Sequence, residues 1–168
     1  MTNPGAFNIF PQGDREIVMT RVFDAPRDLV FEAYTTPELV SQWLLGPDGW
    51  TMPVCEIDLR PGGTYRWVWR QESKGTEMGV HGVYREIVAP ERIVNTEAFD
   101  DPWYSGEALV TNVFTEEGGK TRLTVTMQME SREARDGVLK SGMESGVARS
   151  YDRLEELLAS RVERPASP

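Results

Sequence analysis

The chain has only one cysteine and one histidine among its 168 residues. Cys55 has no partner for an internal disulfide, and no group of cysteines or histidines is present to hold a zinc ion. His81 is the only histidine from which a Ser-His-Asp arrangement could be built, and no nucleophile motif accompanies it. The acidic residues are not spaced like an EF-hand loop. We therefore expect no catalytic triad, no metal and no cofactor.

Basic residues are also scarce. Lys and Arg total 18 against 27 Asp and Glu, which gives a formal net charge of −9. Nucleic acids and anionic membranes both demand a basic face, so neither is expected as a partner. No apolar run approaches the length of a membrane span, and the N-terminus lacks a signal-peptide pattern. These absences predict a reduced, cytoplasmic protein without membrane insertion, present as a monomer or homodimer.

What the chain does have is the composition of one soluble domain. Its length and its 39% hydrophobic residues allow a single core. We expect that domain over residues 15–160. An irregular arm over residues 1–14, rich in proline and glycine, should precede it, with Phe7, Ile9 and Phe10 able to lie against the body. A disordered tail over residues 161–168 should follow.

The order of elements is predicted by turn residues and hydrophobic spacing. A strand over 15–23 leads into two short helices between Asp24 and Leu45, started by Pro26 and by Thr36-Pro37. Residues 133–160 carry one apolar stripe at helical spacing, which predicts one long helix. Between them, six strands are expected near 53–59, 64–72, 77–88, 92–99, 106–116 and 120–130. A curved antiparallel sheet wrapped around the terminal helix satisfies this order.

The glycine and proline turns also predict which strand residues face each other. A turn at Gly118-Gly119 pairs Phe114 with Leu123 and Val110 with Met127, so the apolar face is the inner one.

Two earlier turns extend that face. A turn centred on Lys74-Gly75 pairs Tyr65 with Tyr84 and Trp67 with Gly82, while a turn at Pro90-Glu91 places Tyr84 beside Glu97 and Gly82 beside Phe99. His81 falls on the outer face.

A set of inward-facing residues therefore forms our candidate ligand site on the sheet and the facing helix. Two interpretations stay open: these residues fill an ordinary core, or they line an apolar pocket, which wide aromatics, methionines and glycines favour. The candidate ligand-binding residues are Tyr65, Trp67, Trp69, Tyr84, Glu97, Phe99, Asn112, Met127, Met143, Val147 and Tyr151.

Glu97 is the candidate polar group of this site. Among apolar side chains its carboxylate loses hydration, so its pKa should rise unless Tyr84 or Asn112 donates a hydrogen bond to the ionised form. Either state suits a ligand anchor, and the protonated one suits a general acid. The alternative is that a bulge turns Glu97 to solvent.

Several separated motifs resemble the bacterial branch of the family of activators of the heat-shock-protein-90 ATPase, in the START-like (SRPBCC) superfamily. They are FDAPRDLVFEAYTTPE (23–38), PGGTY (61–65), HGVYREIVAPERI (81–93), GMESG (142–146) and SYDRLEELL (150–158). The resemblance covers residues 15–160. It implies an α+β helix-grip fold, in which a seven-stranded antiparallel sheet and two short helices surround a long C-terminal helix over a cavity.

The resemblance implies less about function. The superfamily includes lipid and sterol carriers, hormone-binding proteins, polyketide cyclases and chaperone activators linked to the stress response, and no catalytic motif is common to them. The leading hypothesis is a binding module for a small apolar or aromatic molecule in the cavity. The alternatives are an enzyme of the cyclase or hydrolase type acting there, and a co-chaperone-like protein that interacts through its surface.

Overall fold

A bent antiparallel sheet with helices gathered on one side forms the body of the protein. The structure, a computed structural model, describes residues 7–104 and 106–162. Its strands are β1 (Asn8–Gln12), β2 (Glu16–Phe23), β3 (Trp50–Ile57), β4 (Thr64–Gln71), β5 (Thr76–Val88), β6 (Arg92–Phe99), β7 (Ala108–Glu117) and β8 (Lys120–Gln128). Its helices are α1 (Arg27–Thr35), α2 (Pro37–Trp43), α3 (Arg132–Lys140) and α4 (Met143–Val162).

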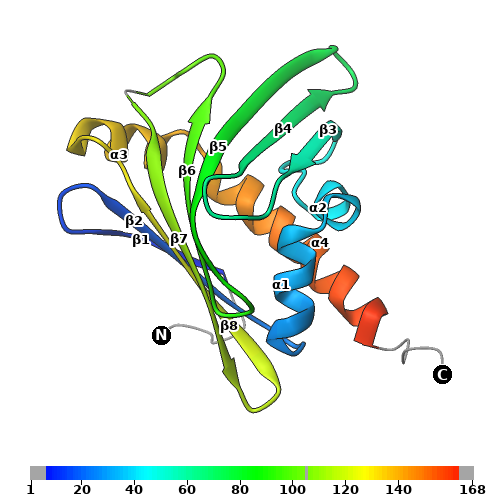
Figure 1. The fold of residues 1–168 in the computed structure, drawn as a ribbon. Coiled ribbons are helices and arrows are strands. Elements are labelled where there is room, and N and C mark those ends of the chain that lie inside the picture. Colours follow the sequence, from blue (N-terminus) through cyan, green and yellow to red (C-terminus); the bar gives the residue numbers. More distant parts are fainter. Residues whose placement is uncertain (1–6, 105, 163–168) are drawn as a thin grey trace.

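All eight strands belong to one sheet, in the order β1-β2-β8-β7-β6-β5-β4-β3. Figure 1 shows α1, α2 and α4 together beside this sheet, with α3 near β1 and β2. The predicted α+β helix-grip architecture is thus confirmed, with one strand more than the seven expected. The added strand is β1, which lies in the segment expected to be an irregular arm. It pairs with β2 and so extends the sheet by one strand. Phe7, just before it, packs edge-on against Tyr151 of α4.

The C-terminal helical region is divided in two, where one helix was predicted. Gly142 has a φ of +83°, a left-handed conformation that glycine adopts easily and that ends a helix. α3 therefore stops at Lys140, and α4 starts at Met143 and continues through Val162, two residues into the predicted tail. The rest of that tail, 163–168, lies outside the described residues.

The start of α1 also differs slightly from the prediction. Pro26 takes the position just before the first helical residue, and its carbonyl accepts hydrogen bonds from the amides of Leu29 and Val30. α2 begins at Pro37 as expected, because a proline at the first helical position has no amide hydrogen to leave unpaired.

Strand register was predicted correctly in one hairpin and shifted in two others. In β7–β8, Phe114 faces Leu123 and Val110 faces Met127, as expected. In β4–β5 the turn is centred one residue earlier than predicted, so Tyr65 faces Gly82 instead of Tyr84. Trp67 consequently faces Val80. The shift amounts to two residues, so every side chain keeps its face.

The β5–β6 pairing also shifts by two residues in all. Val88 faces Arg92 next to the turn, which is one residue of shift, and a bulge between Tyr84 and Glu86 adds the second. Tyr84 faces Asn95 rather than Glu97, and Phe99 faces Val80 rather than Gly82.

The hydrophobic core lies between the concave face of the sheet and the helices. Its largest fully buried side chains include Trp43 of α2, Phe23 of β2, Phe114 of β7 and Leu154 of α4. None of the helices over the described residues combines the length and the apolar character needed to cross a membrane.

Candidate functional site

The concave face of β4 to β8 carries the sheet residues predicted as ligand-binding, and α4 carries the helical ones. Tyr65, Tyr84, Asn112, Met127 and Tyr151 are buried. Six others are partly buried along the same face or on α4: Trp67, Trp69, Glu97, Phe99, Met143 and Val147.

Three aromatic side chains of β4 form a continuous wall. The ring centroids of Tyr65 and Trp67 are 4.7 Å apart, and those of Trp67 and Trp69 are 6.0 Å apart. Tyr84 of β5 lies 5.3 Å from Tyr65. They share a face because they alternate along the pleat, and Gly82 opposite Tyr65 leaves room for its ring.

A chain of hydrogen bonds crosses this face from β7 to β4. Asn112 donates to Oδ1 of Asn95 (3.1 Å), and Asn95 donates to the hydroxyl of Tyr65 (3.1 Å). Tyr65 in turn donates to the backbone carbonyl of Thr96. Sequence reasoning missed Asn95, although its position two residues before Glu97 on the same strand already placed both on one face.

Glu97 lies on this face beside three tyrosines. Burial raises its pKa to about 7, against an ordinary value of 4.5. Burial raises the pKa of Tyr65 and of Tyr104 as well, and the charge of Glu97 raises both further. The pKa of Tyr151 rises to about 12, mainly by burial. Glu97 has no salt bridge among the described residues, and its predicted neighbour Tyr84 lies opposite Asn95 instead.

Two polar atoms near the aromatic wall are buried without a hydrogen-bond partner in the described part of the chain: the indole nitrogen of Trp67 and the hydroxyl of Tyr104. The indole nitrogen of Trp69, by contrast, donates to the carbonyl of Leu44 at 2.7 Å. Sequence analysis did not single out Tyr104, because it lies in the irregular segment between β6 and β7.

That segment adds two aromatic rings, those of Trp103 and Tyr104, to one end of the face. Tyr104 packs edge-on against Phe99 (5.9 Å) and Trp103 (4.9 Å). Trp103 is 46% exposed. The cluster therefore reaches from the concave face to the surface.

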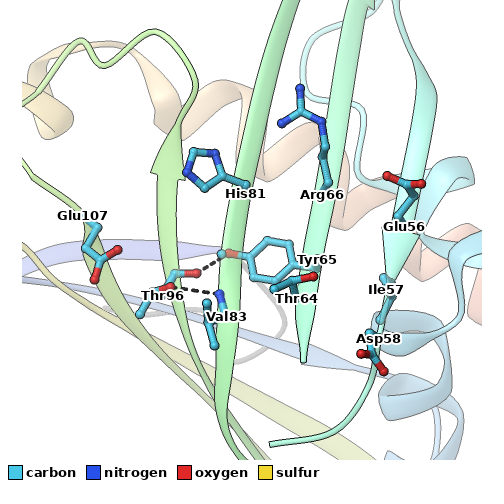
Figure 2. A pocket seen from close by; sticks show the side chains of 11 residues that line it. Glu56, Ile57, Asp58, Thr64, Tyr65, Arg66, His81, Val83, Thr96 and Glu107 are labelled. Carbon is cyan, nitrogen blue, oxygen red and sulfur yellow. Dashed lines mark hydrogen bonds between the residues drawn. The ribbon is translucent and has the colours of Figure 1, made fainter. Parts of the chain in front are cut away.

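A hollow of about 520 Å³ lies on the opposite face of the sheet. Figure 2 shows Arg66 and His81 above it, with Glu56 and Glu107 on either side. It is lined by Glu56, Ile57, Asp58, Thr64, Tyr65, Arg66, His81, Gly82, Val83, Thr96 and Glu107.

Asp100 joins Arg66 and His81 beside this hollow. Its carboxylate accepts two hydrogen bonds from Arg66 (2.9 and 2.6 Å) and contacts Nδ1 of His81 at 2.9 Å. These bonds lower the pKa of Asp100 to about 2. Gly79 makes room for the arrangement, because a Cβ there would meet the Asp100 carboxylate. His81 thus lies on the outer face, as predicted, in a structural ion-pair cluster.

Comparisons with known proteins agree on one family and one fold. The family model described as "Activator of Hsp90 ATPase homolog 1-like protein" matches residues 24–159. A crystal structure of a Rhodobacter sphaeroides protein is similar, with a TM-score of 0.86 and 30% identity, covering 92% of this chain and 99% of that one. A Chromobacterium violaceum protein has a TM-score of 0.74 and 26% identity, over 86% and 96% of the two chains.

A third solved structure shows the fold alone. It is an AHSA1-like protein from Aeromonas hydrophila, with a TM-score of 0.68 and 17% identity, covering 90% of this chain and 99% of that one. The comparison with curated proteins gave no match.

Proposed function

Because the chain belongs to the Activator of Hsp90 ATPase homolog 1-like family, whose START-like fold commonly binds hydrophobic ligands, we propose that it binds a small apolar or aromatic molecule. The proposed site lies between the concave face of the sheet and α4. It consists of the predicted ligand-binding residues, with Tyr104 and Asn95 added.

The observation that carries this proposal is the aromatic wall of Tyr65, Trp67 and Trp69. Three large rings on alternate positions of one strand, tilted against each other by 40° and 57°, offer a broad apolar surface, and Trp67 and Trp69 are only partly buried. Aromatic ligands stack on such rings with a gain of about 0.5–1.5 kcal/mol per pair beyond simple burial. Met127 and Met143 provide adaptable contacts on facing elements.

Glu97 is the proposed polar anchor. Its carboxyl group lies among aromatic and apolar side chains and is half-protonated near neutral pH. A group in this state can donate a hydrogen bond to a ligand or accept one from it. Glu97→Gln should therefore change ligand affinity or its pH dependence while leaving the fold intact.

The proposal is tested with N-phenyl-1-naphthylamine, an uncharged aromatic probe whose emission rises in apolar surroundings. We expect saturable binding to the wild type, weakened at least about tenfold by Val147→Trp, because the larger side chain would fill the space between α4 and the sheet. Circular dichroism should show that the variant stays folded.

Arg70→Gln is the matched control, since Arg70 is exposed on the outer face of the same strand as the aromatic wall. It should bind the probe like the wild type. Equal binding by the wild type and a folded Val147→Trp variant would place the probe elsewhere and contradict the proposed site.

A further inference from the structure

The two unpartnered donors of the candidate site indicate what kind of ligand it takes. The indole N–H of Trp67 and the hydroxyl of Tyr104 are buried and make no hydrogen bond within the described structure. Leaving a buried donor unsatisfied costs about 1–3 kcal/mol, and native proteins rarely keep such groups without a reason. A ligand that offers acceptors to both would recover this loss.

Both donors belong to the same end of the concave face. Trp67 faces Val80, and Val80 faces Phe99, so these three side chains form one row across β4, β5 and β6. Tyr104 packs on Phe99 at the end of that row. Glu97, two residues before Phe99, is close enough for its charge to act on Tyr104.

Apart from Glu97, the proposed polar anchor, the other polar groups nearby are already satisfied. The hydroxyl of Tyr65 donates to the Thr96 carbonyl and accepts from Asn95, and the amide of Asn95 is used in the same chain. Trp69 has its own acceptor, the Leu44 carbonyl. Trp67 and Tyr104 are therefore the buried donors on this aromatic surface that a ligand can engage, besides the carboxyl group of Glu97.

We propose that the ligand of this site is an aromatic molecule bearing an uncharged carbonyl group, which accepts hydrogen bonds from Trp67 and Tyr104. This inference rests on the proposed function. An indole N–H can only donate, so the ligand atom it meets must be an acceptor. A carboxylate is disfavoured, because Glu97 adds negative charge beside the site and forms no salt bridge among the described residues. The ligand atom must therefore accept hydrogen bonds and carry no negative charge, and a ketone, quinone or aldehyde oxygen does both.

Tyr104 also borders the surface of the protein. Its ring packs edge-on against Trp103, which is 46% exposed, so these two residues form the outer limit of the aromatic cluster.

The test compares two probes of the same shape, 2-acetylnaphthalene and 2-isopropenylnaphthalene, in which a CH₂ replaces the carbonyl oxygen. In a purely apolar site the hydrocarbon binds more tightly, because the ketone must give up its bound water. We expect the opposite for the wild type, a preference for the ketone of roughly five- to tenfold, measured as the ratio of dissociation constants by isothermal titration calorimetry.

Two variants each remove one donor: Tyr104→Phe keeps the ring, whereas Trp67→Phe also makes it smaller, as the control Trp69→Phe does. Tyr104→Phe and Trp67→Phe should each lower the preference for the ketone several-fold, and the double variant should prefer the hydrocarbon. Tyr104→Phe should also keep or raise the melting temperature, since it removes an unsatisfied buried hydroxyl. Trp69→Phe is the matched control: its indole already has an acceptor, so the ketone preference should persist while the protein becomes less stable.

The outcomes separate the two proposals. Equal affinity of the wild type for both probes, or a preference that survives in the double variant, would overturn the inference and leave the proposed function standing. Failure of the wild type to bind either probe would contradict the proposed function for aromatic ligands, and the inference with it.

Discussion

At the scale of single residues, Glu97 shows how the surroundings of a side chain set its chemistry. Its carboxyl group lies on the concave face near Tyr65, Tyr104 and Tyr151, all of which stay neutral well above physiological pH. No cation pairs with Glu97 in the described structure, so burial dominates and its pKa rises to about 7. The folded state therefore favours the protonated form, and ionising the group weakens the fold.

Ionising the buried carboxyl group of Glu97 lowers the free energy of unfolding, and Glu97→Gln should remove this pH-dependent cost. Because the folded pKa lies above the ordinary value of 4.5, the cost is absent below pH 4.5, grows through the interval up to pH 7, and is complete above it. At pH 8 the variant should be more stable than the wild type by up to about 3 kcal/mol, with near-equal stability at pH 4. Urea unfolding at several pH values measures the difference. Parallel curves for both proteins would show that Glu97 ionises as if exposed.

Gly82 is a second residue whose surroundings leave no room for a side chain. A Cβ at this position would run into the Thr96 carbonyl and the ring of Tyr65. Gly82→Ala should therefore destabilise the protein by roughly 2–3 kcal/mol, because backbone and a buried ring would both have to shift. Gly137→Ala is a suitable control, since nothing lies within 4 Å of the added Cβ. Thermal denaturation measures both, and a Gly82→Ala protein as stable as the wild type would contradict this packing.

At the scale of elements, α4 is held to the rest of the protein by a buried stripe. Tyr151, Leu154 and Leu158 are buried on one side of the helix, at the spacing of successive turns. Tyr34 of α1 donates a hydrogen bond to the hydroxyl of Tyr151 at 3.0 Å, and Arg153 donates to the carbonyl of Gly46 at 2.7 Å. Packing and hydrogen bonds together therefore fix the helix against α1 and the segment after α2.

Leu154→Ala should weaken this attachment strongly. Leu154 is fully buried, so truncation removes apolar contact and leaves a cavity, at a cost of about 2–5 kcal/mol. Glu156→Ala on the exposed side of the same helix should change stability by less than about 0.5 kcal/mol. Chemical denaturation compares the two. Similar losses in both variants would mean that helix propensity, rather than burial, governs α4.

At the scale of the whole molecule, the sheet has a protected centre and two open edges. Over residues 7–104 and 106–162, β8 and β7 lie inside the strand order, whereas β1 and β3 each pair on one side only. Edge strands carry backbone groups that no neighbouring strand covers. Local opening should therefore be easiest at the two edges of the sheet.

Hydrogen–deuterium exchange should show slower exchange at the centre of the sheet than at its two edges. Amides of β7 and β8 should exchange most slowly, and those of β1 and β3 at least about tenfold faster, because opening an edge breaks one set of pairings rather than two. Mass spectrometry of peptic fragments measures the rates. Equal protection of β1 and β8 would indicate that the edge of the sheet is covered, for example by a second copy of the chain.

The faces of the strands could be predicted from sequence, whereas the partners across them could not. Tyr65, Trp67 and Trp69 were placed correctly on the concave face, because side chains alternate along a strand and a register shift of two residues preserves that alternation. Their partners were wrong, because the β4–β5 turn is centred one residue earlier than its Lys74-Gly75 motif predicts.

The sequence by itself determined the order of the elements from β2 to β8, the inner and outer faces and the family, because hydrophobic spacing, turn residues and motifs are local properties of the chain. Only the tertiary structure decided that Tyr65 covers Gly82, that β1 extends the sheet, and that Trp67 and Tyr104 lack hydrogen-bond partners within the described structure. These features depend on the exact centre of a turn, the place of a bulge and the path of the segment after β6. Such positions follow from how distant parts of the chain pack together, and no local pattern encodes them.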